Sequence, residues 1–451
     1  MKFSRRCGGL GVPSGGRRNA VAEADNGMIV RLPFNRPNQV LMDQKTQSGR
    51  MTQRYLKKRE AILHAAAQLF NQHGIKGATL SDVAGRVGLS TNSITYYYKK
   101  KEDLVVACLL GSIDVINDII SVAAKSANAE DRVRQFIRLF FNRLGQIQGD
   151  KAPEMMTFRE VQVLGSPHAE VIFAAYTGMF RRVRQLLIIN AVTSDNRMLL
   201  NARSHLLLTL TLGAMTWLSR YDPQDYELVA ASMSNILIGG LASNTSQWRY
   251  VALDDSLAHA PDSSDTTQDA FLRAATALIN ELGYRGASVD RISARLKVTK
   301  GSFYHHNPNK DDLISECFER TFSVTRRMQI IARAGEGSGW DKLCAVSRAL
   351  VSYQFSGQGP LLRMSAWSEL PDDIRDNKLK TINQLGLRFV GLLVEGMKDG
   401  SIRPLDQSVA AFQVSGMINA SIVLDRWVPD ITAENAVELF VRPLFLGILS
   451  A

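Results

Sequence analysis

The stretch GIKGATLSDVAGRVGLSTNSITYYYKKKEDL, residues 74–104, contains two short helix-forming segments joined by a tight turn. Thr79 stands at an N-cap position before the first of them, and Gly88 stands where that helix must end. Just upstream, residues 57–74 place apolar side chains at three- and four-residue steps, the period of a helix that buries one face. Three short helices with a glycine-containing turn between the second and third predict a helix-turn-helix arrangement.

The same pattern recurs 209 residues later, where residues 283–313 read GYRGASVDRISARLKVTKGSFYHHNPNKDDL. The two stretches align without a gap: Gly74 and Gly77 fall on Gly283 and Gly286, Thr79 falls on Ser288, and the apolar positions match. A repeat unit of about 200 residues is far longer than the units of solenoid proteins. The chain is therefore predicted to hold two copies of one whole unit.

Each helix-turn-helix segment, called a head below, is followed by a long amphipathic helical region, called a body. The predicted fold class is all-α, with two such units. The predicted segments are a disordered basic tail (1–50), the first head (51–106), the first body (107–250), a linker (251–268), the second head (269–314) and the second body (315–451). The predicted body helices are 128–148, 153–165, 168–192, 197–220 and 224–246 in the first copy, and 311–333, 338–357, 361–371, 374–399, 405–427 and 432–450 in the second.

Both copies resemble the TetR family of bacterial transcriptional regulators, most strongly over residues 55–110 and 266–320. The family is marked by a run like G-x-x-(T/S)-(hydrophobic)-Y-x-(H/Y)-F-x-x-K-x-x-L. The second copy reads VTKGSFYHHNPNKDDL, with Asn307 where Phe is usual, and the first reads LSTNSITYYYKKKEDL. In the first, Thr95 takes the usual Tyr position and Tyr98 the usual Phe position. The resemblance implies a head whose third helix enters the DNA major groove and a body that senses a ligand and dimerises.

The excess positive charge lies in the first quarter of the chain. The net charge is +11, and residues 1–50 hold nine Lys or Arg against three Asp or Glu. Residues 51–106 hold nine against four, and the remainder is balanced. This asymmetry indicates an acidic partner, with nucleic acid favoured over an anionic membrane. Met51 follows the tail closely, so a start codon placed too far upstream is an alternative explanation of residues 1–50.

The helix begun by Ser90 or Thr91 is the predicted recognition helix of the first head. Short polar side chains at its first turn suit contact with bases, and phenols and ammonium groups beside it suit contact with phosphates. Tyr98 is predicted to be core, because it replaces a buried Phe. The predicted DNA-binding residues of the first head are Thr79, Thr91, Asn92, Ser93, Thr95, Tyr96, Tyr97 and Lys101.

The second head is expected to bind DNA less tightly or to be mainly structural. Residues 265–314 hold seven Lys or Arg against six Asp or Glu, and Asp290, Asp311 and Asp312 oppose phosphate binding. Its predicted DNA-binding residues are Ser288, Lys300, Gly301, Ser302, Tyr304, His305 and Lys310.

The resemblance implies an effector, a small molecule of unknown identity, in the body. Aromatic and Met residues at helical spacing are more often core than pocket, so we expect core roles for Met155, Met156, Phe158, Phe173, Tyr176, Met179, Trp217, Met364, Trp367, Met417 and Trp427. Arg159, Glu160 and His168 suit either polar pocket groups or a surface network.

The last two helices of each copy are apolar along a broad face and are expected to form a four-helix interface. Two copies in one chain could supply this interface internally, giving a pseudo-twofold monomer. Pairing between chains, giving a homodimer with four heads, is the competing arrangement.

The expected function is a sequence-specific DNA-binding regulator, a ligand-responsive repressor that binds a double-stranded operator in the bacterial cytoplasm, associated with the nucleoid. The alternative is a non-catalytic interaction or sensor protein in which one or both heads no longer read DNA. An enzyme is disfavoured because the sequence holds no GxSxG, HExxH or glycine-rich phosphate loop. No cofactor, metal site or membrane span is expected. The most apolar segment, 206–218, reads as a buried helix, and the four cysteines as reduced, mostly buried thiols.

Overall fold

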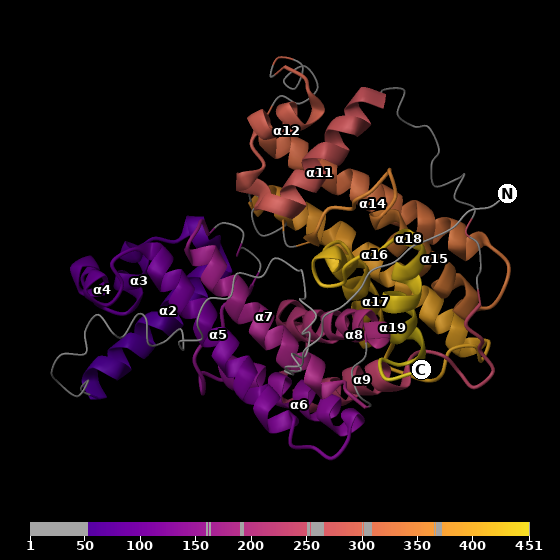
Figure 1. Ribbon diagram of the computed structural model, residues 1–451, viewed down its shortest axis with the longest axis horizontal. Coiled ribbons are helices and arrows are strands. Elements are labelled where there is room, and N and C mark those ends of the chain that lie inside the picture. Colours follow the sequence, from indigo (N-terminus) through magenta and orange to yellow (C-terminus); the bar gives the residue numbers. More distant parts are fainter. Residues whose placement is uncertain are drawn as a thin grey trace, which may run out of the picture. The chain divides into compact units, whose positions relative to one another are not determined.

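The computed structural model of the chain describes residues 53–158, 161, 164–189, 194–249, 253, 266–299, 301, 309–364, 366 and 372–450. The predicted tail and nearly all of the predicted linker lie outside these residues. Within the described part, helices supply the secondary structure, and the only β contact is an isolated bridge between Ala242 and Ile402 (Figure 1).

The first head has the three helices that its sequence predicts. Gly74 adopts φ 73°, so the long first helix kinks there and the chain turns toward the second. The Thr79 hydroxyl accepts a hydrogen bond from the backbone N–H of Asp82, whose carboxylate accepts one from the N–H of Thr79. This capping box satisfies two backbone donors that would otherwise lack partners. The helices are α2 (Gln53–Gly77), α3 (Leu80–Arg86) and α4 (Thr91–Tyr97), followed by α5 (Lys101–Ala123).

The second head repeats this geometry wherever it is described. Gly283 kinks its first helix at φ 72°, as Gly74 does in the first copy. The turn after its second helix keeps the left-handed backbone but not the glycine, because Lys297 adopts φ 57° at the position where the first copy has Gly88 at φ 63°. A side chain in this left-handed region costs about 1–2 kcal/mol, which glycine avoids. The described helices are α11 (Thr266–Gly286), α12 (Val289–Leu296) and α14 (Lys310–Ala334).

Exchanging the residue at this turn should change the stability of the two heads in opposite directions. Lys297→Gly should raise the free energy of unfolding of the second head by about 1 kcal/mol, because the left-handed strain is removed. Gly88→Ala should lower that of the first head by a similar amount, although a Cβ there meets nothing within 4 Å. Hydrogen exchange of amides in α12 and α3 measures both effects. A stabilised Gly88→Ala head would contradict the strain argument.

The bodies are helical, with two departures from the predicted elements. The first body contains α6 (Ala129–Gln148), α7 (His168–Leu186), α8 (Ser194–Gly213) and α9 (Tyr226–Gly239), with the short 3₁₀ helices η2 (Ala214–Thr216), η3 (Leu218–Arg220) and η4 (Pro223–Asp225) between the last two. The second contains α15 (Gly339–Gln354), α16 (Asp372–Lys398), α17 (Gln407–Ser421), the 3₁₀ helix η6 (Leu424–Arg426), α18 (Ala433–Ala436), the π-helical η7 (Val437–Val441) and α19 (Arg442–Leu446).

The helix predicted near 432–450 is present over residues 433–446, but it is not α-helical throughout and it ends earlier. Pro443 has no N–H and cannot complete the α-helical bond to the residue four positions earlier. The chain instead passes through one π-helical stretch before α19 begins.

The helices predicted over 153–165 and 361–371 are wrong wherever these segments are described. Side chains from the heads hold both segments in irregular conformation. The amide of Asn71 on α2 donates to the Met155 carbonyl at 2.9 Å and accepts from the Thr157 N–H at 2.9 Å. The amide of Asn280 on α11 binds the Leu361 carbonyl and the Arg363 N–H in the same way, at 2.8 and 2.9 Å.

A hydroxyl completes each of these contacts, which we call the asparagine clamps. The Met156 N–H donates to the Ser112 hydroxyl at 2.8 Å, and the Leu362 N–H donates to the Thr321 hydroxyl at 2.9 Å. With their backbone groups paired to side chains, these segments do not need a helical ladder. Each clamp ties a body to the head of the same copy.

The sequence predicts no segment long and apolar enough to span a membrane, but helix α5 meets both criteria. Among the described residues it is the one helix long and apolar enough to cross a membrane by length and composition, with mean hydropathy 1.9. It packs against α2, α6 and α7, and its buried residues belong to the hydrophobic clusters of the first copy. Cys108, Cys317 and Cys344 are buried free thiols, as predicted, and Cys7 lies outside the described residues.

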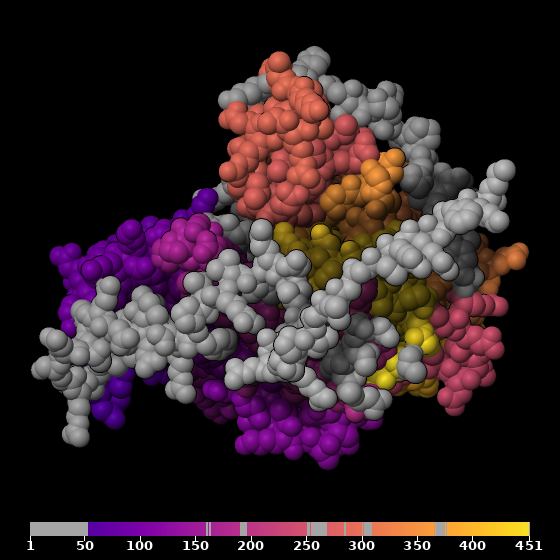
Figure 2. Space-filling model, viewed as in Figure 1, coloured from indigo at the N-terminus to yellow at the C-terminus, as the bar shows by residue number. Residues whose placement is uncertain are grey.

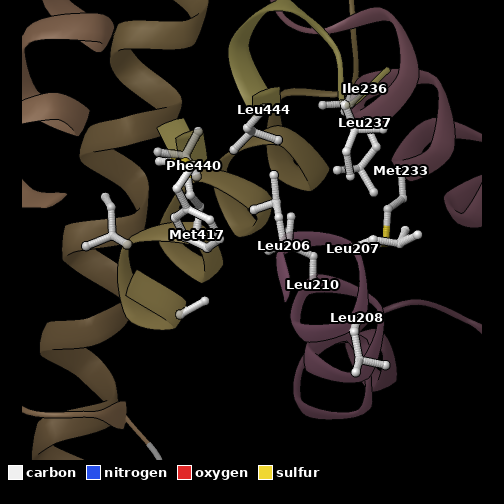
Figure 3. Close-up of a cluster of buried hydrophobic side chains, with 14 of the residues drawn as sticks. Leu206, Leu207, Leu208, Leu210, Met233, Ile236, Leu237, Met417, Phe440 and Leu444 are labelled. Atoms are coloured by element: carbon white, nitrogen blue, oxygen red, sulfur yellow. The ribbon is translucent and has the colours of Figure 1, made fainter. Parts of the chain in front are cut away.

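The late helices of the two bodies pack together and share one hydrophobic core. Helix α17 packs on α8 and α9, and α9 packs on α19. Figure 3 shows this core, with Leu206 and Leu237 of the first copy beside Met417, Phe440 and Leu444 of the second. The predicted four-helix interface therefore exists within one chain.

Two glycines allow the backbones to touch at this interface. The Leu241 N–H donates to the Phe445 carbonyl at 2.8 Å, and the Ile448 N–H donates to the Leu237 carbonyl at 2.7 Å. A Cβ at Gly240 would lie 2.4 Å from the Phe445 carbonyl oxygen, and a Cβ at Gly447 would lie 2.3 Å from that of Ile238. The contact is reciprocal, as a pseudo-twofold axis requires.

A buried histidine lies in the same interface. His205 on α8 is 4% exposed, its Nε2 lies 3.0 Å from the Ala420 carbonyl oxygen, and its ring stacks on Phe440. Burial lowers the pKa of His205 to about 4. Below its ordinary pKa of about 6.5, the unfolded chain takes up a proton that the folded chain excludes. Stability is therefore lost as the pH falls from about 6.5 toward 4.

Replacing His205 by a side chain that does not titrate should remove this pH-dependent loss of stability. Between pH 7.5 and 5.0 the free energy of unfolding of the wild-type bodies should fall about 2 kcal/mol more than that of His205→Gln. The Gln amide can still donate to the Ala420 carbonyl. Urea denaturation at both pH values measures the difference, and equal losses would contradict a neutral buried His205.

Candidate nucleic-acid interface

The predicted recognition helix α4 presents its first turn to solvent. Its N-cap is Ser90, whose hydroxyl accepts from the Ser93 N–H at 3.2 Å. Thr91 and Asn92 are exposed, and half-buried Thr95 donates its hydroxyl hydrogen to the Asn92 carbonyl at 3.0 Å. The side chains of Thr91 and Asn92 therefore remain accessible to base edges. Part of the first head, drawn in indigo, forms surface on the face shown in Figure 2.

Three tyrosines cluster beside this turn. Tyr96 is 63% exposed, and its ring meets the ring of half-buried Tyr97 edge to face, with centroids 5.3 Å apart. Tyr97 also packs on Tyr55 from the first turn of α2, at 4.8 Å. Burial raises the pKa of Tyr97, so the phenol stays protonated as a hydrogen-bond donor. The sequence reasoning missed Tyr55, which precedes the periodic part of the first helix.

The core role predicted for Tyr98 is confirmed. It is 8% exposed and packs in the cluster that holds Ile94 and Leu104. Burial raises its pKa to about 12, and the nearby Arg59 only partly offsets this. Among three consecutive tyrosines, the helix thus exposes Tyr96, half-buries Tyr97 and buries Tyr98.

Thr79 and Lys101, which were predicted to bind phosphate, make bonds within the head. The Thr79 hydroxyl donates to the Asp82 carboxylate at 2.8 Å, and this bond lowers the pKa of Asp82. The ammonium of Lys101 donates to the Ala78 carbonyl at 3.1 Å. An ammonium has three hydrogens, so Lys101 can bind a phosphate as well. The hydrogen of the Thr79 hydroxyl is already used.

The second head is described only in part at the corresponding positions. Lys300, Ser302, Tyr304 and His305 lie outside the described residues. Ser288 caps α12 by accepting from the Arg291 N–H, Gly301 is exposed, and Lys310 begins α14.

The structure also places the body residues for which the sequence predicted polar or core roles. Arg159, Glu160 and Trp367 lie outside the described residues. His168 lies between head and body, where its Nε2 is 3.2 Å from the Asp103 carboxylate at the start of α5. Core roles are confirmed for Met155, Met156, Met179, Trp217 and Met417, whereas Phe173 is 61% exposed, so its core assignment is wrong. Met364 packs partly buried against the hydrophobic cluster of the second head and also lines a cavity. Phe158, Tyr176 and Trp427 pack against the core partly buried.

The asparagine clamps and their hydroxyl partners were not identified from the sequence. They keep the repeat spacing, however, and extending the comparison of the copies beyond residues 74–104 would have paired Asn71 with Asn280 and Ser112 with Thr321. The described residues hold no group of three or more His, Cys, Asp or Glu side chains that could bind a metal ion.

The exposed and buried tyrosines of α4 should respond differently to loss of the hydroxyl. Tyr96→Phe should weaken DNA binding about fivefold, because one hydrogen bond to a phosphate is worth about 1 kcal/mol. Tyr98→Phe should leave DNA affinity unchanged and should not lower the melting temperature. Fluorescence anisotropy and thermal denaturation of both variants provide the measurement. A larger loss of affinity in Tyr98→Phe than in Tyr96→Phe would overturn the assignment.

Comparison with known proteins agrees with the positions of the two heads. Residues 62–108 and 271–317 match the family described as bacterial regulatory proteins, tetR family. Over 118 residues the chain is 28% identical to the Transposon Tn10 TetC protein of Escherichia coli, covering 25% of this chain and 59% of that protein. Over 132 residues it is 30% identical to the HTH-type transcriptional repressor DhaR of Mycobacterium sp. strain GP1, covering 28% of this chain and 66% of the repressor.

The matched part of the chain thus spans less than two thirds of the length of these two relatives. Among solved structures, AibR in complex with isovaleryl coenzyme A and operator DNA is 21% identical, with a TM-score of 0.33, and the match covers 41% of this chain and 99% of that chain.

The two heads define a helix-turn-helix protein that is built twice in one chain. The family match falls on both copies at the same repeat spacing. Both heads are thus similar to the tetR family of bacterial regulatory proteins, and the chain carries two such TetR-like units in tandem.

Proposed function

We propose that this protein is a sequence-specific DNA-binding transcriptional regulator, a ligand-responsive repressor, and not an enzyme. The observation that carries the proposal is the accessible first turn of α4, with Thr91 and Asn92 exposed beside the phenol of Tyr96. The relatives support it, because DhaR is named a transcriptional repressor. Such a protein acts in the bacterial cytoplasm, on the nucleoid.

The first head dominates DNA affinity in this proposal. Its segment 51–106 carries nine basic residues against four acidic ones, whereas 265–314 carries seven against six. Phosphate contacts supply much of the affinity of DNA-binding proteins, and each lost contact weakens it. The second head then reads a second half-site less tightly.

The functional particle in this proposal is a pseudo-twofold monomer with two heads. Its support is the core shared by α8 and α9 of the first copy with α17 and α19 of the second. These faces, which two chains supply in a single-unit dimer, are already covered within one chain.

Equivalent lysines of the two heads provide a matched test on the protein's own upstream DNA. Lys101→Ala should reduce affinity about tenfold and lower the slope of log affinity against log salt by about one. Lys310→Ala, the corresponding change in the second head, should cost less than threefold. Fluorescence anisotropy between low and moderate salt measures both, with thermal denaturation to check that the Ala78 bond is not needed for folding.

Absence of sequence-dependent binding at low salt would contradict the regulator and favour the non-DNA-binding alternative. Sedimentation of the free protein at micromolar concentration tests whether the protein is a monomer. The expected mass is that of one chain, 49.9 kDa, and a mass twice as large would contradict the pseudo-twofold monomer.

A further inference from the structure

The body of the second copy contains a partly open cavity of about 110 Å³ between α14, the end of α15, α16 and α17. Most of its wall is apolar, including Phe322, Leu385 and Phe389. None of the described residues that line it carries a charge. The polar side chains in the wall are Thr321, Thr325, Gln354, Ser415 and Asn419.

The side-chain oxygens in this wall are largely used by the neighbouring backbone. The Gln354 Oε1 accepts from the Leu361 N–H at 2.9 Å, and the Asn419 Oδ1 accepts from the Met364 N–H at 2.9 Å. The Thr321 hydroxyl accepts from the Leu362 N–H. An amide whose oxygen faces the segment 361–364 turns its NH₂ group the other way.

The amide nitrogen of Gln354 is the donor without a partner. Gln354 is 9% exposed, and its Nε2 is buried with no hydrogen-bond partner among the described residues. A buried unpaired donor costs about 1–3 kcal/mol, which a ligand carrying an acceptor recovers. A ligand with a hydrogen-bond acceptor in the cavity would therefore supply the partner that Gln354 Nε2 needs.

Size and charge narrow the ligand further. This cavity is smaller than a dry cavity of about 150 Å³ that takes benzene, so it suits a narrow chain rather than a ring. Burying an ion without a counter-charge costs several kcal/mol. A neutral molecule is favoured over a carboxylate or an ammonium.

The corresponding region of the first copy is filled by aromatic rings. The clamped segments 155–157 and 361–363 are 206 residues apart, as are Arg220 and Arg426 near the ends of the bodies. At this spacing, Gly386 in the cavity wall corresponds to Phe180. The Phe180 ring stacks on Trp427 of the second copy at 4.4 Å.

We propose that this cavity is the effector site of the chain and that its ligand is small, mainly apolar and neutral, with one acceptor oxygen such as an amide or ketone carbonyl. Gln354 Nε2 is the group that recognises the acceptor. The regulatory role of this ligand rests on the proposed function, whereas its binding to the cavity does not.

The cavity is connected to the second head by the asparagine clamp. Thr321 and the segment Leu361–Leu362 belong to both the clamp and the cavity wall. Asn280 of α11 holds the same segment from the head side. A ligand that displaces this segment would also shift the head that Asn280 belongs to. The ligand would then bind two positions of the head with different affinity, which is what coupling between the two sites requires.

Calorimetric titration of the full chain with pentanamide and pentanoate tests the ligand chemistry, because the two have the same number of non-hydrogen atoms and differ in charge. Pentanamide should bind at least tenfold more tightly. Gln354→Met, which keeps the length of the side chain, should weaken pentanamide about fivefold to tenfold. Equal binding of both compounds, or undiminished binding by Gln354→Met, would overturn the proposal.

A pair of glycine variants on α16 tests the location. A Cβ at Gly386 meets nothing within 4 Å, so Gly386→Leu can be accommodated and should abolish binding by filling the cavity. Gly391→Leu, at an exposed position of the same helix where a Cβ also meets nothing, should leave binding unchanged. Retained binding in Gly386→Leu with a normal melting temperature would place the ligand elsewhere and overturn the proposal.

Operator binding measured on the same samples separates this inference from the proposed function. DNA binding without pentanamide binding contradicts the cavity and leaves the regulator intact. Pentanamide binding without any DNA binding contradicts the regulator and leaves the ligand chemistry intact. If both occur and pentanamide does not change DNA affinity, the effector role is overturned.

Discussion

The close contact between the two bodies is the constraint on which the rest of the structure depends. Helices α8 and α9 are apolar over a broad face that neither body can bury alone. The backbones approach so closely at Gly240 and Gly447 that a methyl group at either position would overlap a carbonyl oxygen. Because one hydrophobic cluster includes residues of both copies, the two bodies fold against each other as one core.

The heads are attached to this core by polar contacts of defined geometry. In each copy an asparagine from the first head helix binds a carbonyl and an N–H two residues apart, and a hydroxyl binds the N–H between them. A buried amide with both ends paired tolerates little displacement, because an unpaired group is costly in a low-dielectric interior. The clamp therefore holds each head firmly against the body of its own copy.

The two copies have diverged where packing left them free to do so. Gly88 was replaced by Lys297 in a turn that still requires a left-handed backbone. Asp82 of the capping box corresponds to Arg291, which cannot accept the N–H of Ser288 through a carboxylate. In the bodies, Phe180 stands at the sequence position that corresponds to Gly386; the Phe180 ring stacks on Trp427, whereas Gly386 lines the cavity. The two units therefore keep the same fold while differing in these local features.

The sequence by itself determined the local structure of the heads, because helix ends, caps and turns depend on neighbouring residues. Gly74 kinks α2, and Thr79 and Ser90 cap the helices that directly follow them. It also indicated that Tyr98 is buried, since Tyr98 takes the position of a buried Phe in the family motif. The tertiary structure decided what distant residues do to one another. The segment 153–165 has a helical pattern but is held open by Asn71, more than eighty residues away in the chain. The aromatic cluster around Tyr55, the shared core and the cavity beside Gln354 likewise arise only when separate helices meet, because their energies depend on packing and desolvation that no local pattern records.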